Sequence, residues 1–154
     1  MQFLDKAKEL DKNPLLKKLI LFLVITLLLY LGLDIVLHHQ QIGLTFTSAS
    51  NTILGNEEEF LDPILFDVLL EHVHANILSS MITLLLLTTI YIRLKAESKQ
   101  RLIHLSFSTA ILSQVILLLT TTLPLLINIW IVVFLLWHLS AFILGFIIIG
   151  KLLK

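Results

Sequence analysis

The chain has 154 residues, of which 57% are hydrophobic and only 14% are charged, and its mean hydropathy is +0.96. This excess of apolar residues excludes an ordinary soluble domain and indicates an integral membrane protein. The formal net charge is zero and cysteine is absent, which excludes disulfides, thiolate metal sites and haem attached through cysteine.

Residues 1–18 combine lysines with regularly spaced apolar residues, which predicts a short amphipathic segment at the membrane surface. Asn13 is expected to cap the helix that follows, with Pro14 at its first position. The first span is predicted at residues 19–37. Its last part carries Asp34, and His38 follows one helical turn later, so carboxylate and imidazole can touch.

Residues 39–62 are predicted to form a long acidic loop, because the stretch is rich in small polar residues and contains no lysine or arginine. Further spans are predicted at about 64–92, 102–123 and 127–149. The sequence therefore predicts an all-α, integral membrane four-helix bundle, with residues 1–154 as a single membrane domain.

The basic residues predict the orientation of this bundle. All 11 lysines and arginines lie within residues 1–18, 93–101 and 151–154. Four spans place these three segments on the same side of the membrane, so the positive-inside rule predicts cytoplasmic N- and C-termini and an outer loop at 39–62. We expect an integral protein of the bacterial inner membrane.

The second predicted helix carries two rows of polar side chains. Asp67, Glu71 and His74 share one face, whereas His72 and Asn76 share another about a quarter-turn away. Ionisable side chains at bilayer depth are costly, so such a group indicates a functional site. Helix rise places His72 and His74 about 10–14 Å below a membrane boundary near Leu65.

A haem hypothesis follows from the estimated depths of the histidines. His74 and His138 lie at similar depth on different helices, and two imidazoles can ligate a b-type haem. His39 or His38 with His72 forms a second possible pair. The arrangement is similar to that of small four-helix b-type cytochromes in membrane redox complexes, which implies electron transfer or an accessory role. Orienting or proton-handling groups would then be Asp67, Asn76, Gln114 and Glu71.

Two alternatives remain open. A divalent transition metal, namely zinc, copper or iron, fits the imidazole and carboxylate groups of one proposed ligand set: Asp34, His38, Glu71, His72 and His74. A structural small subunit is the other alternative, because Ala141 and Gly145 are spaced for close helix packing. The expected partners are the lipid bilayer and either a larger redox complex or a second copy of the chain.

The sequence contains no motif that supports the other functions considered. The sequence contains no glycine-rich phosphate loop and no G-x-S-x-G, and topology explains its basic residues. We therefore expect no nucleic-acid binding, and the sequence favours a role other than that of an autonomous enzyme.

Overall fold

The computed structural model describes residues 13–94 and 100–153, and these are helical apart from short connections. The α-helices are α1 (Pro14–Gln41), α2 (Phe46–Leu54), α3 (Phe66–Arg93), α4 (Gln100–Leu119) and α5 (Leu126–Leu152). Four of them, α1, α3, α4 and α5, are long and apolar enough to cross a membrane. The predicted all-α bundle of four membrane-spanning helices is therefore confirmed.

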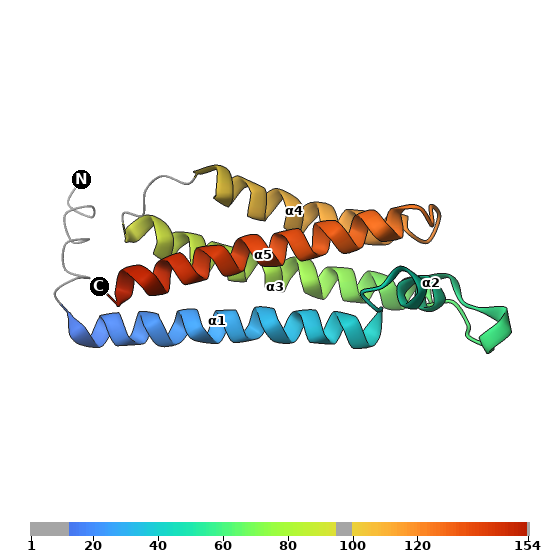
Figure 1. The fold of residues 1–154 in the computed structure, drawn as a ribbon, viewed down its shortest axis with the longest axis horizontal. Coiled ribbons are helices and arrows are strands. Elements are labelled where there is room, and N and C mark those ends of the chain that lie inside the picture. Colours follow the sequence, from blue (N-terminus) through green and yellow to red (C-terminus); the bar gives the residue numbers. More distant parts are fainter. Residues whose placement is uncertain (1–12, 95–99, 154) are drawn as a thin grey trace.

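The bundle has two chemically different ends. Figure 1 shows α1, α3, α4 and α5 running side by side, with α2 at one end, called here the α2 end. The opposite end is called the basic end, because the described lysines and arginines lie there: Lys17, Lys18, Arg93, Arg101 and Lys151. This separation is the one that the charge pattern predicts, although which end faces the cytoplasm stays a prediction.

The helix α1 begins earlier than the predicted residue 19. Asn13 accepts hydrogen bonds at its side-chain oxygen from the backbone N–H groups of Leu15, at 3.1 Å, and Leu16, at 3.3 Å. Pro14 fills the first helical position, as the sequence predicts. The lysines after it belong to the helix, so only residues 1–12 of the predicted surface segment remain, and these lie outside the described residues.

The predicted loop at 39–62 is wrong in part, because it contains α2. Thr45 caps this helix by accepting a hydrogen bond from the Ser48 backbone N–H at 3.2 Å. Ala49 and Ile53, one turn apart, are buried, and α2 packs against α5. Burial of these two apolar residues on one face therefore stabilises a helix in a segment whose composition otherwise indicates a loop.

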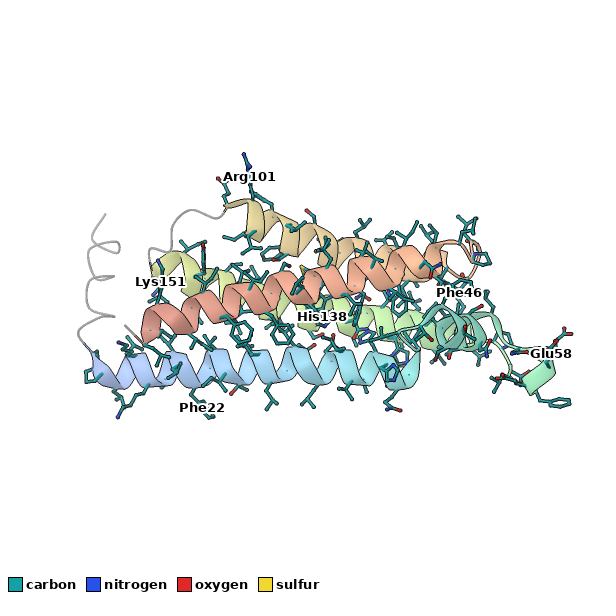
Figure 2. All side chains as sticks on the ribbon, in the orientation of Figure 1. Phe22, Phe46, Glu58, Arg101, His138 and Lys151 are labelled. Atoms are coloured by element: carbon teal, nitrogen blue, oxygen red, sulfur yellow. The ribbon has the colours of Figure 1, made fainter. Side chains whose placement is uncertain are left out.

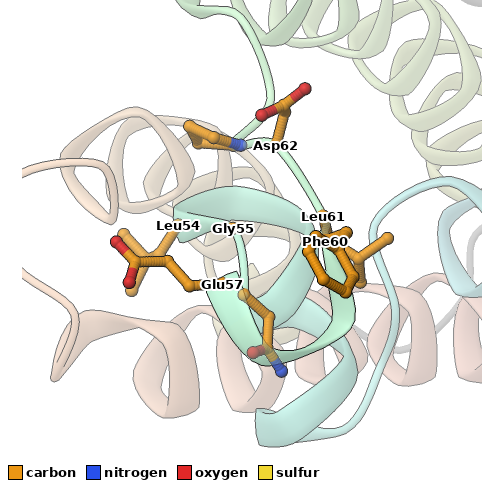
Figure 3. Close-up of a pocket in the computed structure, with 8 residues that line it drawn as sticks. Leu54, Gly55, Glu57, Phe60, Leu61 and Asp62 are labelled. Atoms are coloured by element: carbon orange, nitrogen blue, oxygen red, sulfur yellow. The ribbon is translucent and has the colours of Figure 1, made fainter.

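Beyond α2 the chain makes a tight turn at the tip of the molecule. Gly55 ends the helix at φ 79°, and residues Glu57–Glu59 form a 3-10 turn. The backbones of Asn56 and Leu61 then pair through two hydrogen bonds of 2.8 and 2.9 Å. Figure 3 shows this turn in close-up, with the Glu57 and Asp62 side chains projecting from it.

The remaining helices differ only slightly from the predicted spans. The helix α3 starts at Phe66 and ends at Arg93, close to the expected 64–92. The helix α4 stops at Leu119, four residues before the expected end, because turns at 120–125 lead directly into α5.

The helix α5 is the centre of the bundle, since it packs against every other α-helix. The helix α1, in contrast, contacts the bundle through a narrow stripe and packs on α3 and α5. Its buried residues are Val24, Leu31, Asp34 and His38. Half-buried apolar residues beside this stripe also pack against the core, and two of the four buried residues are ionisable, so polar contacts add to the apolar packing that holds α1.

Candidate functional site

The carboxylate of Asp34 joins α1 to α5. Its Oδ2 lies 3.0 Å from Nε2 of His138, and the two side chains are only 8% and 1% exposed. Figure 2 marks His138 in the half of the bundle nearer the α2 end, between α1 and α5. Asp34 and His138 each appear among the sequence-predicted site residues, but in different sets. Their direct contact is the main finding of the structure.

A second imidazole lies beside the same carboxylate. His38, one turn after Asp34, donates from Nδ1 to the backbone carbonyl of Asp34 at 2.9 Å, and this nitrogen also lies 3.5 Å from Oδ1 of Asp34. The expected contact between Asp34 and His38 is therefore confirmed. On its other side, His38 Nε2 accepts a hydrogen bond from Nδ2 of Asn76 on α3, at 2.8 Å. The network thus links α1 to α3 as well as to α5.

The hydrogen bonds determine where protons lie in the pair of Asp34 and His138. Nδ1 of His138 is 2.9 Å from the carbonyl oxygen of Phe134, so this nitrogen carries a hydrogen. A single further proton then lies between Nε2 of His138 and Oδ2 of Asp34. With that proton the pair is neutral overall, either as an ion pair or as carboxylic acid and neutral imidazole.

Aromatic rings surround the network on the α5 side. The His138 ring lies 3.8 Å from the ring of Trp137 and 4.3 Å from that of Phe134, measured between centroids. The Phe134 ring also lies 4.5 Å from the His38 ring. These apolar walls lower the local dielectric, which strengthens hydrogen bonds within the network and raises the cost of any unpaired charge.

The two rows of polar residues on α3 lie on different sides of the helix, as their spacing predicts. Asp67, Glu71 and His74 are exposed on the outer surface of α3, whereas His72 and Asn76 are half-buried toward the bundle. His72 lines an open hollow of about 400 Å³ at the α2 end. The network and the exposed row are therefore separate groups of residues.

Counting from the basic end gives a shallower estimate for the exposed row than a membrane boundary near Leu65 does. The helix α3 has 28 residues and is about 42 Å long, whereas the hydrocarbon core is about 30 Å thick, or about 20 residues. Counting about 20 residues from Arg93 ends near His74, which leaves Asp67 and Glu71 beyond the hydrocarbon. The same count from Lys18 ends near residue 38, so Asp34 lies about one turn inside.

The arrangement does not fit a haem held by His74 and His138. His74 is exposed on the outer surface of α3, while His138 is buried with both ring nitrogens engaged by Asp34 and Phe134. In the second pair, His39 is exposed, and both ring nitrogens of His38 are already bonded, to the Asp34 carbonyl and to Asn76. Ligation of iron by His138 or His38 would require these hydrogen bonds to break.

The proposed metal ligands are likewise dispersed. Asp34 and His38 lie in the buried network, whereas Glu71 and His74 are on the exposed row. Within residues 13–94 and 100–153, no group of three or more His, Asp or Glu side chains is arranged to hold a metal ion. Gln114, a predicted orienting residue, is buried on α4, where its amide nitrogen lies 3.4 Å from Ser113 Oγ.

The chain was also compared with known proteins. Residues 43–154, which include α2 to α5, match the model of the Aq_1264_TM family, described as a transmembrane helical domain. No curated protein and no solved structure matches the chain. Asn76 and His138 lie within the matched range, and Asp34 and His38 lie before it.

Proposed function

This chain belongs to the Aq_1264_TM family of transmembrane helical domains, and we propose that it is a proton-responsive membrane protein. The site of proton binding is the network of Asp34, His38 and His138. Its protonation state sets how α1 is held against α3 and α5. The observation that carries the proposal is the buried Asp34 carboxylate lying between two imidazoles.

A purely structural role explains this carboxylate less well. Placing an aspartate in the hydrocarbon costs about 2.5–3.5 kcal/mol on insertion scales. An interhelical polar contact in a membrane bundle returns about 0.6 kcal/mol on average and about 1.7 at most. A neutral serine or asparagine would join the helices at lower cost. A titratable carboxylate adds the ability to take up and release a proton.

The proposal also gives a role to the polar contacts that α1 makes with α3 and α5. Two hydrogen bonds from α1 to other helices, Asp34 to His138 and His38 to Asn76, involve imidazoles. Imidazole is the side chain whose charge changes near neutral pH. A change of protonation therefore alters both contacts at once, while the narrow apolar stripe of α1 changes little.

Distance measurements between α1 and α5 test this function. The chain has no cysteine, so spin labels can be placed at Val36→Cys and Leu139→Cys, two exposed positions on these helices. We expect the distance distribution in nanodiscs to change over roughly pH 5–8. Asp34→Asn, which keeps the size and a hydrogen-bonding group but cannot titrate, should remove this change. A distribution that is independent of pH in the unsubstituted protein would overturn the proposal.

The haem and metal hypotheses remain predictions. A haem between His74 and His138 would require His138 to give up its hydrogen bond to Asp34 and to ligate the iron instead. An absorption spectrum of the purified protein, oxidised and reduced, with metal analysis of the same sample, tests both hypotheses. A Soret band that shifts on reduction, or one metal ion per chain, would favour them over the proton-binding function. A redox-complex partner and self-association also remain predictions.

A further inference from the structure

The α2 end of the molecule is acidic. Between Lys18 and Arg93 the sequence contains no lysine or arginine. The carboxylates of this end are all exposed: Glu57, Glu58, Glu59, Asp62, Asp67 and Glu71. Such a surface raises the local concentration of cations, protons included.

An open hollow lies in this acidic surface, and one of its lining residues, His72, is one helical turn from Asn76 of the buried network. The hollow of about 400 Å³ lies between the end of α1, α2, the 61–64 segment and α3, and its polar lining is Gln41, Asn51, Thr52, Asp62 and His72. Half-buried His72 lies one turn from Asn76 on the same face of α3. It is also close enough to His38 for the two imidazoles to interact electrostatically.

The geometry points to this hollow as the proton entrance of the site, with His72 as the first receiving group, an inference that rests on the proposed function. Solvent in the hollow protonates His72, and the proton passes from the His72 ring, past Asn76, to Nε2 of His38. This step requires the Asn76 amide to turn, so that its oxygen accepts from the new N–H. His38 then releases its Nδ1 proton to Oδ1 of Asp34, so one proton enters the ring and one leaves.

The charged and titratable groups around His72 are few. Asp62 faces it across the hollow, His38 faces it from α1, and α2 contributes no titratable residue. Glu71 and His74 lie on the exposed row of the same helix and do not line the hollow. His74 is therefore a matched control, because it is the same residue type two positions away, outside the proposed path.

A stopped-flow pH jump tests the entrance. Trp137 contacts His138, so its fluorescence reports a change of charge at the pair, and Trp130→Phe removes the only other tryptophan. In this background, His72→Gln should slow the fluorescence change by about tenfold or more without altering its end points, because a positioned proton-transfer group is lost. His74→Gln should leave the rate within about twofold, since a group outside the path contributes nothing.

The outcomes distinguish failure of the proposed entrance from failure of the proposed function. Equal rates for His72→Gln and His74→Gln, with the fluorescence change still abolished by Asp34→Asn, would overturn the entrance and leave the proton-binding site standing. No fluorescence change in the Trp130→Phe background, with native helicity by circular dichroism, would count against both. A slowed rate specific to His72→Gln supports the entrance.

Discussion

Replacing Asp34 and His138 by alanine, singly and together, measures how strongly this pair holds α1 on α5. Asp34→Ala leaves Nε2 of His138 buried without a partner, because the ring is 1% exposed and its other nitrogen stays bonded to Phe134. His138→Ala leaves Oδ2 of Asp34 without its donor. The double variant removes both groups and therefore leaves neither unpaired.

The expected coupling energy follows from these contacts. An unpaired buried polar group costs about 1–3 kcal/mol, and hydrogen bonds to charged groups contribute about 1.5–3. The double variant should therefore be less destabilised than the sum of the single variants by about 1.5–3 kcal/mol. This exceeds the average of about 0.6 kcal/mol for polar contacts in a membrane protein. The pair is thus expected to be an exceptional contact.

Unfolding in sodium dodecyl sulphate, followed by circular dichroism, gives the free energies for the four proteins. Glu71→Ala combined with His138→Ala is the matched control, because Glu71 is exposed on the outer row of α3. These two changes should add within about 0.5 kcal/mol. A coupling between Asp34 and His138 of about 0.6 kcal/mol or less would refute the reasoning, since the pair would then be an ordinary polar contact.

Two further predictions concern the neighbours of this pair. Asn76→Asp replaces the amide that donates to His38 Nε2 by an acceptor. The His38 ring should therefore carry hydrogens on both nitrogens across roughly pH 5–8. Nitrogen-15 NMR spectra that show only one ring hydrogen would contradict this. Gly145→Leu should destabilise the protein to sodium dodecyl sulphate by about 1–3 kcal/mol, because an added Cβ overlaps Cδ2 of Leu28 on α1. Gly150→Leu is the control, because nothing lies within 4 Å of the added Cβ. Equal destabilisation by the two substitutions would show that crowding against α1 is not the cause.

Features encoded locally in the sequence were predictable. The capping of α1 by Asn13, the four spans and the separation of basic and acidic ends depend on residues that are near one another in the chain. That the two rows on α3 lie on different faces also follows from helical spacing, whereas the exposure of Asp67, Glu71 and His74 was not predicted.

Which side of each helix faces the bundle was not predictable, because lipid and protein core favour the same apolar residues. On α1, Phe22 is 74% exposed and points away from the bundle in Figure 2, whereas Leu31 is fully buried. The contact of Asp34 with His138 depends on this orientation and on α1 lying beside α5. Estimated depth alone instead paired His138 with His74, whose side chain is on the outside of α3.

The separation of Asp34 and His138 along the chain has a consequence for biosynthesis. The two residues are 104 positions apart, and a ribosome adds about 5–20 residues per second. Asp34 is therefore made about 5–20 s before the imidazole that binds it. During this interval the carboxylate would lack its donor on α5 and have only His38 beside it, so the nascent α1 is expected to stay near the membrane surface or to enter with Asp34 protonated. Its final docking is then the last step of assembly, completed only after α5 has emerged.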